Sequence, residues 1–505
     1  MGALRRRQVT FLSPSGRGAS HAWRLFVIFQ CLYALTSSGN AFRLPDEYTT
    51  YYQVERFVDA GDISVPQELP RQQFFGQIGV DGKPYAPWGP LTAFLAIPHH
   101  LAGRAVASLA GIPRSDAVVW TFIVSGITML TTSTAAALAV AGFYSAAVLL
   151  GATPASARLL SLLLGASVMW TSGTNLFSEA WQAAGFIWAT VFLLKRRVGL
   201  AAILIAAAGL TKFTSLIFTP AFVAAVLVDS STPWRTRVRA ALGVSAGIAF
   251  CLGVHLAWNQ FRFGSPFDFG YNWVETVPEL PVRVFLLSDL PRGLVILLFS
   301  PGKSIFVWAP ALLLSMTRLP QSPRAVTVGV LVSLALGLVF FGSYLYPEGG
   351  YSHGPRQLVP IIPLLLLPAA APGPPFHRST VIFCAVTGAL VAMLSVSVSY
   401  LQDQSMGRDG SQTNYFERVT PPPGRAVNRY RLDYIPFVRT IGSAEWPVGQ
   451  VGHGIDIFPL QIARARETIP QARVIPAWLP WALPAFWLVI LIPALFWRRV
   501  PSPSA

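Results

Sequence analysis

Long apolar segments recur along most of the chain, and they constrain its fold more than any other feature. The chain has 505 residues, of which 53% are hydrophobic and only 12% charged, and its mean hydropathy is +0.51. This composition lies outside the range of soluble globular proteins. A membrane-spanning helix needs roughly 20 mainly apolar residues, and shorter helices suffice where protein covers their ends. We therefore expect an all-α polytopic membrane protein.

The apolar segments predict a bundle of about 12 transmembrane helices. The expected crossings are 22–39, 117–148, 156–172, 176–194, 198–210, 213–228, 240–259, 300–317, 325–344, 357–371, 379–400 and 478–497. An even number of crossings places both termini on one side of the membrane. Basic clusters such as 5–7, 195–197 and 498–499 fall on that side, which the positive-inside rule makes cytoplasmic.

Two segments are assigned from the side of the membrane on which the basic clusters lie. Residues 87–106, "PWGPLTAFLAIPHHLAGRAV", are expected to form an interfacial helix on the outer face, because a crossing there would move every later basic cluster outside. Residues 198–228 are expected to form a hairpin of two short helices with Lys212 near its outer tip. A cleaved signal peptide remains the alternative to a retained first helix.

The net charge of +16 follows from the same topology. The cytoplasmic segments are rich in Lys and Arg and contain one acid, Asp229, whereas charges elsewhere cancel. The basic balance therefore fits a lipid bilayer as the partner, and no nucleic acid is expected.

The expected organisation is a membrane module with extracytoplasmic loops. Its parts are a cytoplasmic N-terminus (1–21), the membrane module (22–400) with outer loops 40–116 and 260–299, an outer Pro/Gly/Arg-rich segment (401–477), a last crossing (478–497) and a cytoplasmic tail (498–505).

Two adjacent acids follow the first apolar segment. In "RLPDEYTTYYQ", Pro45 is expected to begin a helix, with Asp46 and Glu47 in its first turn, where the helix dipole favours negative charge. The simplest alternative is that both acids only stabilise the helix N-terminus. A third acid, Glu179 in "TSGTNLFSEAW", lies at the outer end of a crossing, where an ionisable group is costly and is a functional candidate. Its alternative role is to cap a short outer turn.

Isolated basic residues are expected on the same face. They are Lys83 in "DGKPYAPW", Lys303 in "FSPGKSIFVW", and His353 and Arg356 in "YSHGPRQLVP". Each long cationic side chain could simply reach the membrane interface. Together, carboxylates and fixed cations supply what attack on a sugar phosphate needs: a base for the acceptor hydroxyl and positive charge for the departing phosphate.

The motifs resemble a known family. "LPDEYTTYYQ", "GDISVPQ" and "GKPYAPW" resemble the first extracytoplasmic loop of GT-C type membrane glycosyltransferases, notably lipid A aminoarabinose transferases and protein O-mannosyltransferases. "NQFRFGSPFDFGY", "LLFSPGKSIFVWAP" and "YSHGPRQLVP" are similar to family-39-like transferases. The likeness extends to about residue 400, so a GT-C-like bundle with interfacial helices in its outer loops is expected.

The resemblance also implies an activity. It implies that Asp46 lies in the active site, commonly as catalytic base, that Glu179 is the second acid, and that Lys83 holds the donor phosphate. Arg356 and Lys303 are further candidates to stabilise the leaving phosphate. If the acceptor is itself a phosphate or carboxylate, Asp46 would position it and no base would be needed. The implied donor is a monosaccharide on a polyprenyl phosphate, the acceptor a lipid, glycan or protein of the cell envelope, and the mechanism inverting. The implied location is the inner membrane, with the active site outside.

Several alternatives stay open. A transporter or flippase for lipids or glycans is the main rival, although it would place ionisable residues near helix centres, where this chain has few. A scaffold protein is a third interpretation. Glu47 is counted among the candidate catalytic acids, with its separate role left open. His353 is counted among the candidate donor-phosphate-binding residues, although such a histidine more often has a structural role than a metal-binding one. No metal site is expected from the spacing, although some related enzymes bind a divalent cation at the acidic pair.

Overall fold

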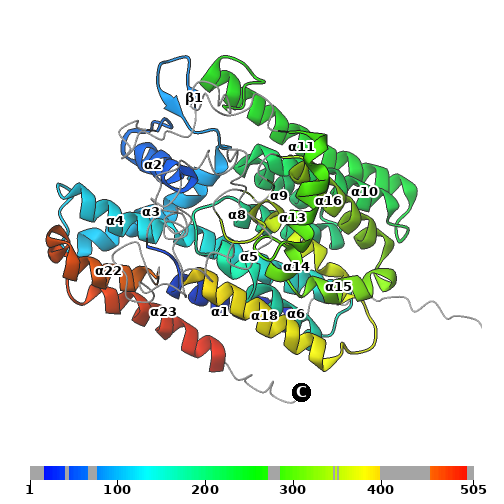
Figure 1. Ribbon diagram of the computed structural model, residues 1–505. Helices are drawn as coiled ribbons and strands as arrows, with labels where there is room; N and C mark the ends of the chain where they lie inside the picture. Colours follow the sequence, from blue (N-terminus) through cyan, green and yellow to red (C-terminus); the bar gives the residue numbers. More distant parts are fainter. Residues whose placement is uncertain are drawn as a thin grey trace, which may run out of the picture.

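The computed structural model describes residues 16–39, 45–65, 77–270, 285–344, 352–397 and 457–496, together with Pro347, Gly349 and Ile455. Within these residues the protein is mainly helical (Figure 1). The described strands are β1 (Gln77–Ile78) and β2 (Pro84–Tyr85), which pair antiparallel as a short hairpin. The expectation of an all-α membrane protein is confirmed for this part of the chain. Most of the outer segment expected at 401–477 lies outside the described residues.

The helices follow the expected crossings closely at many points. The α-helices are α1 (Gly16–Leu35), α2 (Pro45–Ala60), α3 (Leu91–Leu109), α4 (Ala117–Thr128), α5 (Leu130–Leu149), α6 (Pro154–Gly165), α7 (Val168–Ser172), α8 (Glu179–Leu194), α9 (Val198–Thr211), α10 (Pro220–Val228), α11 (Trp234–Phe263), α13 (Leu290–Phe299), α14 (Ile305–Trp308), α15 (Leu312–Arg318), α16 (Arg324–Gly342), α17 (Ile362–Leu365), α18 (Arg378–Val396), α22 (Phe458–Thr468) and α23 (Leu479–Phe496). The 3₁₀ helices are η1 (Phe213–Phe218), η2 (Leu287–Asp289), η3 (Leu319–Gln321), η4 (Arg356–Ile361), η5 (Leu367–Ala370) and η7 (Pro470–Val474).

Five helical stretches within the described residues are long and apolar enough to cross a membrane. They are Ala117–Leu149, Trp234–Phe263, Arg324–Gly342, Arg378–Val396 and Leu479–Phe496. Each overlaps an expected crossing, whereas the total number of crossings stays a prediction. The expected outer loop 260–299 ends in an apolar helix, α13.

Proline divides several of the expected crossings into short pieces. The segment expected at 357–371 consists of η4, α17 and η5, with prolines at 360, 363 and 368. Proline has no backbone N–H and cannot continue a regular helical hydrogen-bond ladder. This irregular segment is buried and contacts α5, α8 and α16. Protein therefore surrounds the broken helix, the setting in which such backbone is tolerated at membrane depth.

Small residues allow the central helices to pack closely. The alanine-rich helix α5 packs against α1 and α8, α8 packs against α9, and α9 packs against α11. Small side chains are typical of helix interfaces in membranes because they let backbones approach. At one end of this bundle, α2 lies on α3, and α22 and α23 pack together nearby (Figure 1). The candidate site lies where α2 meets the bundle.

Candidate active site

The N-terminus of α2 presents the two acids of the first loop. The helix begins at Pro45, so Asp46 and Glu47 lie in its first turn, as the sequence predicts. The two carboxylates have different surroundings. The side chain of Asp46 is 19% exposed, whereas Glu47 is fully buried. Only Asp46 is therefore accessible to an incoming substrate.

Asp46 is joined to Glu179 through Arg356. The Arg356 guanidinium donates from Nη2 to Oδ2 of Asp46 and from Nε to Oε1 of Glu179, the latter over 3.0 Å. The same Glu179 oxygen accepts from Nζ of Lys212 at 3.0 Å. We call Asp46, Glu179, Lys212 and Arg356 the acid–base cluster. Its members come from α2, α8, the junction of α9 with η1, and η4.

The acid–base cluster is mostly buried, and its charges balance. The side chains of Glu179, Lys212 and Arg356 are 3%, 9% and 10% exposed. Removing ions from water is costly unless each has a close partner of opposite charge. Two carboxylates and two cations satisfy this condition. Asp46, the most exposed member, is the one that can exchange its partner for a substrate.

Aromatic rings cover both cations. The Arg356 guanidinium lies 3.6 Å from the centroid of the Phe177 ring, and the Lys212 ammonium lies 5.7 Å from the Trp88 ring. The face of an aromatic ring attracts a cation, more strongly where water is excluded. The rings therefore add to the stabilisation that the carboxylates of Asp46 and Glu179 give to the two cations.

Glu47 points to a different partner. Its Oε1 accepts the backbone N–H of Leu176 at 3.1 Å. This bond joins α2 to the segment that precedes Glu179, so Glu47 helps to fix Asp46 and Glu179 relative to each other. The structure thus gives Glu47 a positioning contact, and its predicted catalytic role remains untested.

Lys303 and His353 hold the loop that precedes Arg356. Nζ of Lys303 donates to the backbone carbonyl of Ser352 at 2.5 Å, and the His353 ring stacks on Trp308 with centroids 6.1 Å apart. Gly354 adopts a positive φ of 70°, which glycine tolerates best. These contacts fix the loop immediately before Arg356 and so help to position its side chain.

Gly354→Ala is expected to disturb this placement. A Cβ there would lie 2.7 Å from the Trp308 ring, and alanine would have to adopt a left-handed backbone. Strain of this kind costs about 1–3 kcal/mol. We expect lower thermal stability and reduced activity, measured on the purified protein. Gly253→Ala in α11, where no atom lies within 4 Å of the added Cβ, is the control. Equal effects of both substitutions would contradict this role of Gly354.

Lys83 lies away from the acid–base cluster. Its ammonium contacts Asp62 at 3.2 Å and Asp81 at 3.9 Å, and its side chain is 48% exposed. Hydrogen bonds from Ser64, Lys83 and Arg56 outweigh the effect of burial and lower the pKa of Asp62. Asp62 follows the C-terminal end of α2, whereas Asp46 begins that helix, so about 20 Å of helix separates them. The structure therefore does not bring Lys83 to Asp46 and Glu179.

Lys212 was not among the predicted site residues, although the sequence contains a signal for it. Lysine is rare within an apolar segment because its charge is costly there, and "GLTKFTS" contains such a lysine at the expected outer tip of a hairpin. Its partner Glu179 is 33 residues away along the chain. The signal identifies Lys212 as a candidate but does not identify its partner.

No metal site is evident among the residues that the structure describes. No group of three or more His, Cys, Asp or Glu side chains is arranged there to hold an ion. Asp46 and Glu179 are the acids that would hold one, but Arg356 binds both of them. Cys31, Cys251 and Cys384 are buried and free.

Comparison with known proteins gives little further support. No protein-family model matches the chain, and no curated protein matches it either. Among solved structures, that of ArnT from Cupriavidus metallidurans in the apo state is similar, with 14% sequence identity and a TM-score of 0.46. The alignment covers 94% of this chain and 76% of that chain. Similarity this low establishes neither a shared fold nor a shared activity.

Proposed function

We propose that the protein is an integral membrane glycosyltransferase of the GT-C type. It moves a monosaccharide from a polyprenyl phosphate to a cell-envelope acceptor on the extracytoplasmic face of the inner membrane. The acid–base cluster carries this proposal, because distant segments of a very apolar chain bring two carboxylates and two cations together. Buried ionisable groups in a membrane protein are costly and are functional candidates.

The proposed reaction is a single displacement. The acceptor hydroxyl oxygen attacks the anomeric carbon of the donor, and the bond from that carbon to the phosphate oxygen breaks, with its electron pair remaining on the phosphate. The hydroxyl proton passes to the carboxylate of Asp46. The products are the glycosylated acceptor and a polyprenyl phosphate. Attack opposite the leaving group inverts the anomeric centre.

The two cations of the acid–base cluster act on the leaving phosphate. Lys212 and Arg356 stabilise the negative charge that develops on the departing phosphate, and such preorganised groups have their largest effect where water is excluded. Glu179 holds both cations in place and compensates their charge until the donor arrives. Lys303 and His353 position the loop of Arg356. Under this proposal Lys212 takes the phosphate-binding role that the resemblance implies for Lys83.

Substitution of Lys212 and of Lys83 tests which of the two lysines binds the donor phosphate. Lys212→Met is expected to weaken binding of a short-chain polyprenyl monophosphate about tenfold or more, since hydrogen bonds to charged groups contribute about 1.5–3 kcal/mol. Lys83→Met should change this binding little, because its exposed ion pairs are worth at most about 1 kcal/mol. Thermal stabilisation of the detergent-purified protein by the lipid phosphate measures both. If Lys83→Met abolished the stabilisation and Lys212→Met did not, the proposed phosphate site would be wrong.

A further inference from the structure

Helix α3 has the two-sided character of a helix that lies on a membrane surface. Its buried face includes His100, Gly103 and Ala107. The opposite face exposes mainly apolar residues at helical spacing, namely Phe94, Pro98, Leu101, Ala105 and Leu109. An exposed apolar face of this kind fits the boundary between lipid headgroups and acyl chains. The outer-surface position expected for α3 from the sequence would supply this setting.

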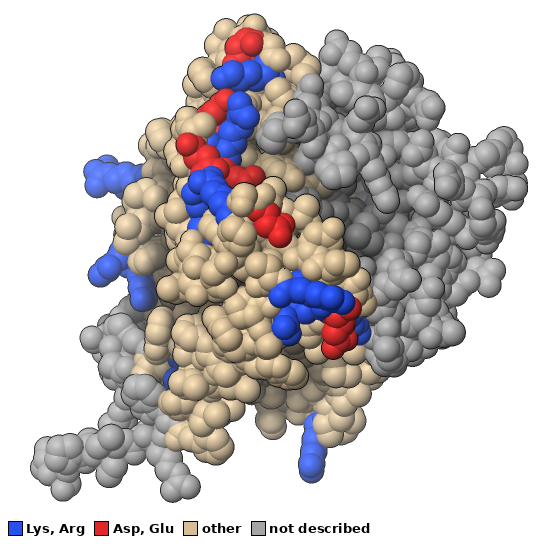
Figure 2. Space-filling view, turned by 90° about the vertical axis from the view of Figure 1, so that its left-hand side faces the viewer, with Lys and Arg blue, Asp and Glu red and all other residues tan. Residues whose placement is uncertain are grey.

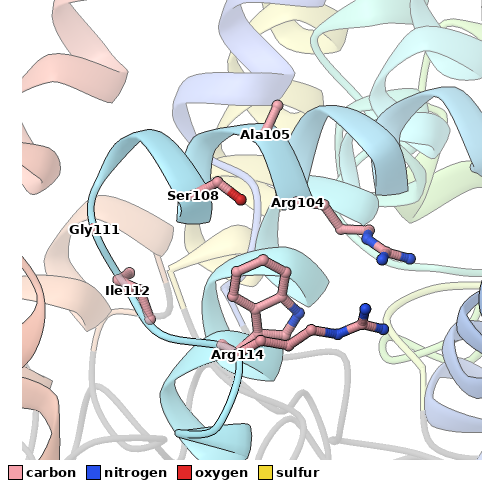
Figure 3. A pocket seen from close by; sticks show the side chains of 7 residues that line it. Arg104, Ala105, Ser108, Gly111, Ile112 and Arg114 are labelled. Atoms are coloured by element: carbon pink, nitrogen blue, oxygen red, sulfur yellow. The ribbon is translucent and has the colours of Figure 1, made fainter.

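An open cavity of about 530 Å³ lies where α3 passes into α4. It is lined by Arg104, Ala105, Ser108, Gly111, Ile112, Arg114 and Trp120, and no acidic side chain is among them. In Figure 3, the side chains of Arg104 and Arg114 extend toward the same side of the pocket. The cavity therefore offers two guanidinium groups, a hydroxyl and an indole to a ligand.

One carboxylate holds both arginines from outside the cavity. Asp59 accepts from Arg104 at 2.6 Å with Oδ1 and from Arg114 at 2.5 Å with Oδ2. Each guanidinium has five N–H donors, so most of them remain for a ligand. The ion pairs are partly exposed, with 56% of the Arg114 side chain open to solvent. Glu55 also interacts electrostatically with both arginines. The preference for an anion therefore rests on the N–H donors that Asp59 leaves unused and not on an excess of positive charge.

We propose that this cavity binds the phosphate of an anionic phospholipid headgroup. Paired arginines match the oxygens of a phosphate by bidentate hydrogen bonds. The lipid source is favoured by the apolar residues on either side of the loop, since Leu109 is 82% and Val118 is 74% exposed. Tryptophan, arginine and exposed aliphatic side chains together are typical of the headgroup layer.

The cavity is separate from the acid–base cluster. Asp59 lies thirteen residues along α2 from Asp46, which corresponds to about 20 Å. Acidic and basic side chains alternate along the upper part of the face seen in Figure 2. The proposal therefore concerns attachment to the membrane surface and does not depend on the proposed enzymatic reaction.

Two substitutions with opposite expected effects test the proposal. The probe is dihexanoyl phosphatidylglycerol, added to the detergent-purified full-length protein and counted as bound lipid by native mass spectrometry. Combined Arg104→Gln and Arg114→Gln should weaken binding of one lipid about tenfold or more. Asp59→Asn should tighten it about twofold to fivefold, because it removes the carboxylate that competes for the arginines. A purely structural ion-pair cluster predicts no gain in Asp59→Asn.

A control and a second probe complete the experiment. Arg56→Gln removes another arginine that is paired with an aspartate, Asp62, and should leave lipid binding unchanged. Inorganic phosphate should compete only weakly with the lipid. Lipid binding that is equal in the wild type and the double arginine variant would overturn the proposal. Inorganic phosphate binding as tightly as the lipid would overturn the headgroup assignment and indicate a small-anion site.

Discussion

Asp46→Asn should reduce glycosyl transfer by about 10²-fold to 10³-fold. The substitution keeps the shape of the side chain but removes the group that accepts the acceptor's proton, and general-base catalysis typically contributes about 10²-fold to 10⁴-fold. Arg356 retains its contact with Glu179, so the fold should be preserved. The measurement is transfer of radiolabelled sugar from a polyprenyl-phosphate donor by purified protein.

The matched control is Glu55→Gln on the same helix. Glu55 accepts the Tyr51 hydroxyl at 3.0 Å, a bond that glutamine can keep, and Glu55 has no place in the proposed reaction. Its transfer rate should stay close to that of the wild type. An unchanged rate in Asp46→Asn would contradict the role of Asp46 as base. A changed KM with an unchanged kcat would show that Asp46 positions an acceptor whose oxygen is already ionised.

Glu179→Gln should destabilise the protein by about 3 kcal/mol or more. The variant leaves Lys212 and Arg356 close together with Asp46 as their remaining carboxylate in the acid–base cluster. Breaking a buried ion pair by removing one partner typically costs 3–5 kcal/mol, because the other charge stays buried. The free energy of unfolding and the transfer rate should both fall, measured on the detergent-purified protein.

The double variant Glu179→Gln/Lys212→Met supplies the decisive comparison. It restores the charge balance of the cluster, so it should be more stable than Glu179→Gln alone. Groups that share one ion-pair network show such non-additivity, whereas independent sites add. A double variant destabilised by the sum of the two single effects would show that Glu179 and Lys212 do not compensate each other.

Features encoded by local patterns could be predicted from the sequence. The first turn of α2 begins at Pro45 as expected, because proline and the two acids are a local helix-start signal. The long apolar stretches from Trp234 and Arg324 likewise match expected crossings. Length and composition determine such elements almost alone. The breaks within the 357–371 segment depend on the surrounding protein, which the sequence pattern does not reveal.

The composition of the candidate site could be predicted only in part. Asp46, Glu179 and Arg356 were each identified as unusual charges, but Arg356 lies 310 residues from Asp46 and 177 from Glu179, so no spacing rule pairs them. Lys83 was associated with Asp46 through the family resemblance and through the membrane face that both were expected to share. Neither indicates that helix α2 lies between them and that its length keeps them apart.

Sugar transfer by the purified wild-type protein is the most direct test of the proposed glycosyltransferase activity. A panel of radiolabelled polyprenyl-phosphate sugars is incubated with the protein and membrane-derived acceptors, and both labelled acceptor and released polyprenyl phosphate are measured. We predict that one donor yields labelled acceptor and polyprenyl phosphate in equal amounts. If every donor stayed intact while the protein moved a lipid or glycan across vesicle membranes, the glycosyltransferase assignment would be wrong. The transporter interpretation would then be correct.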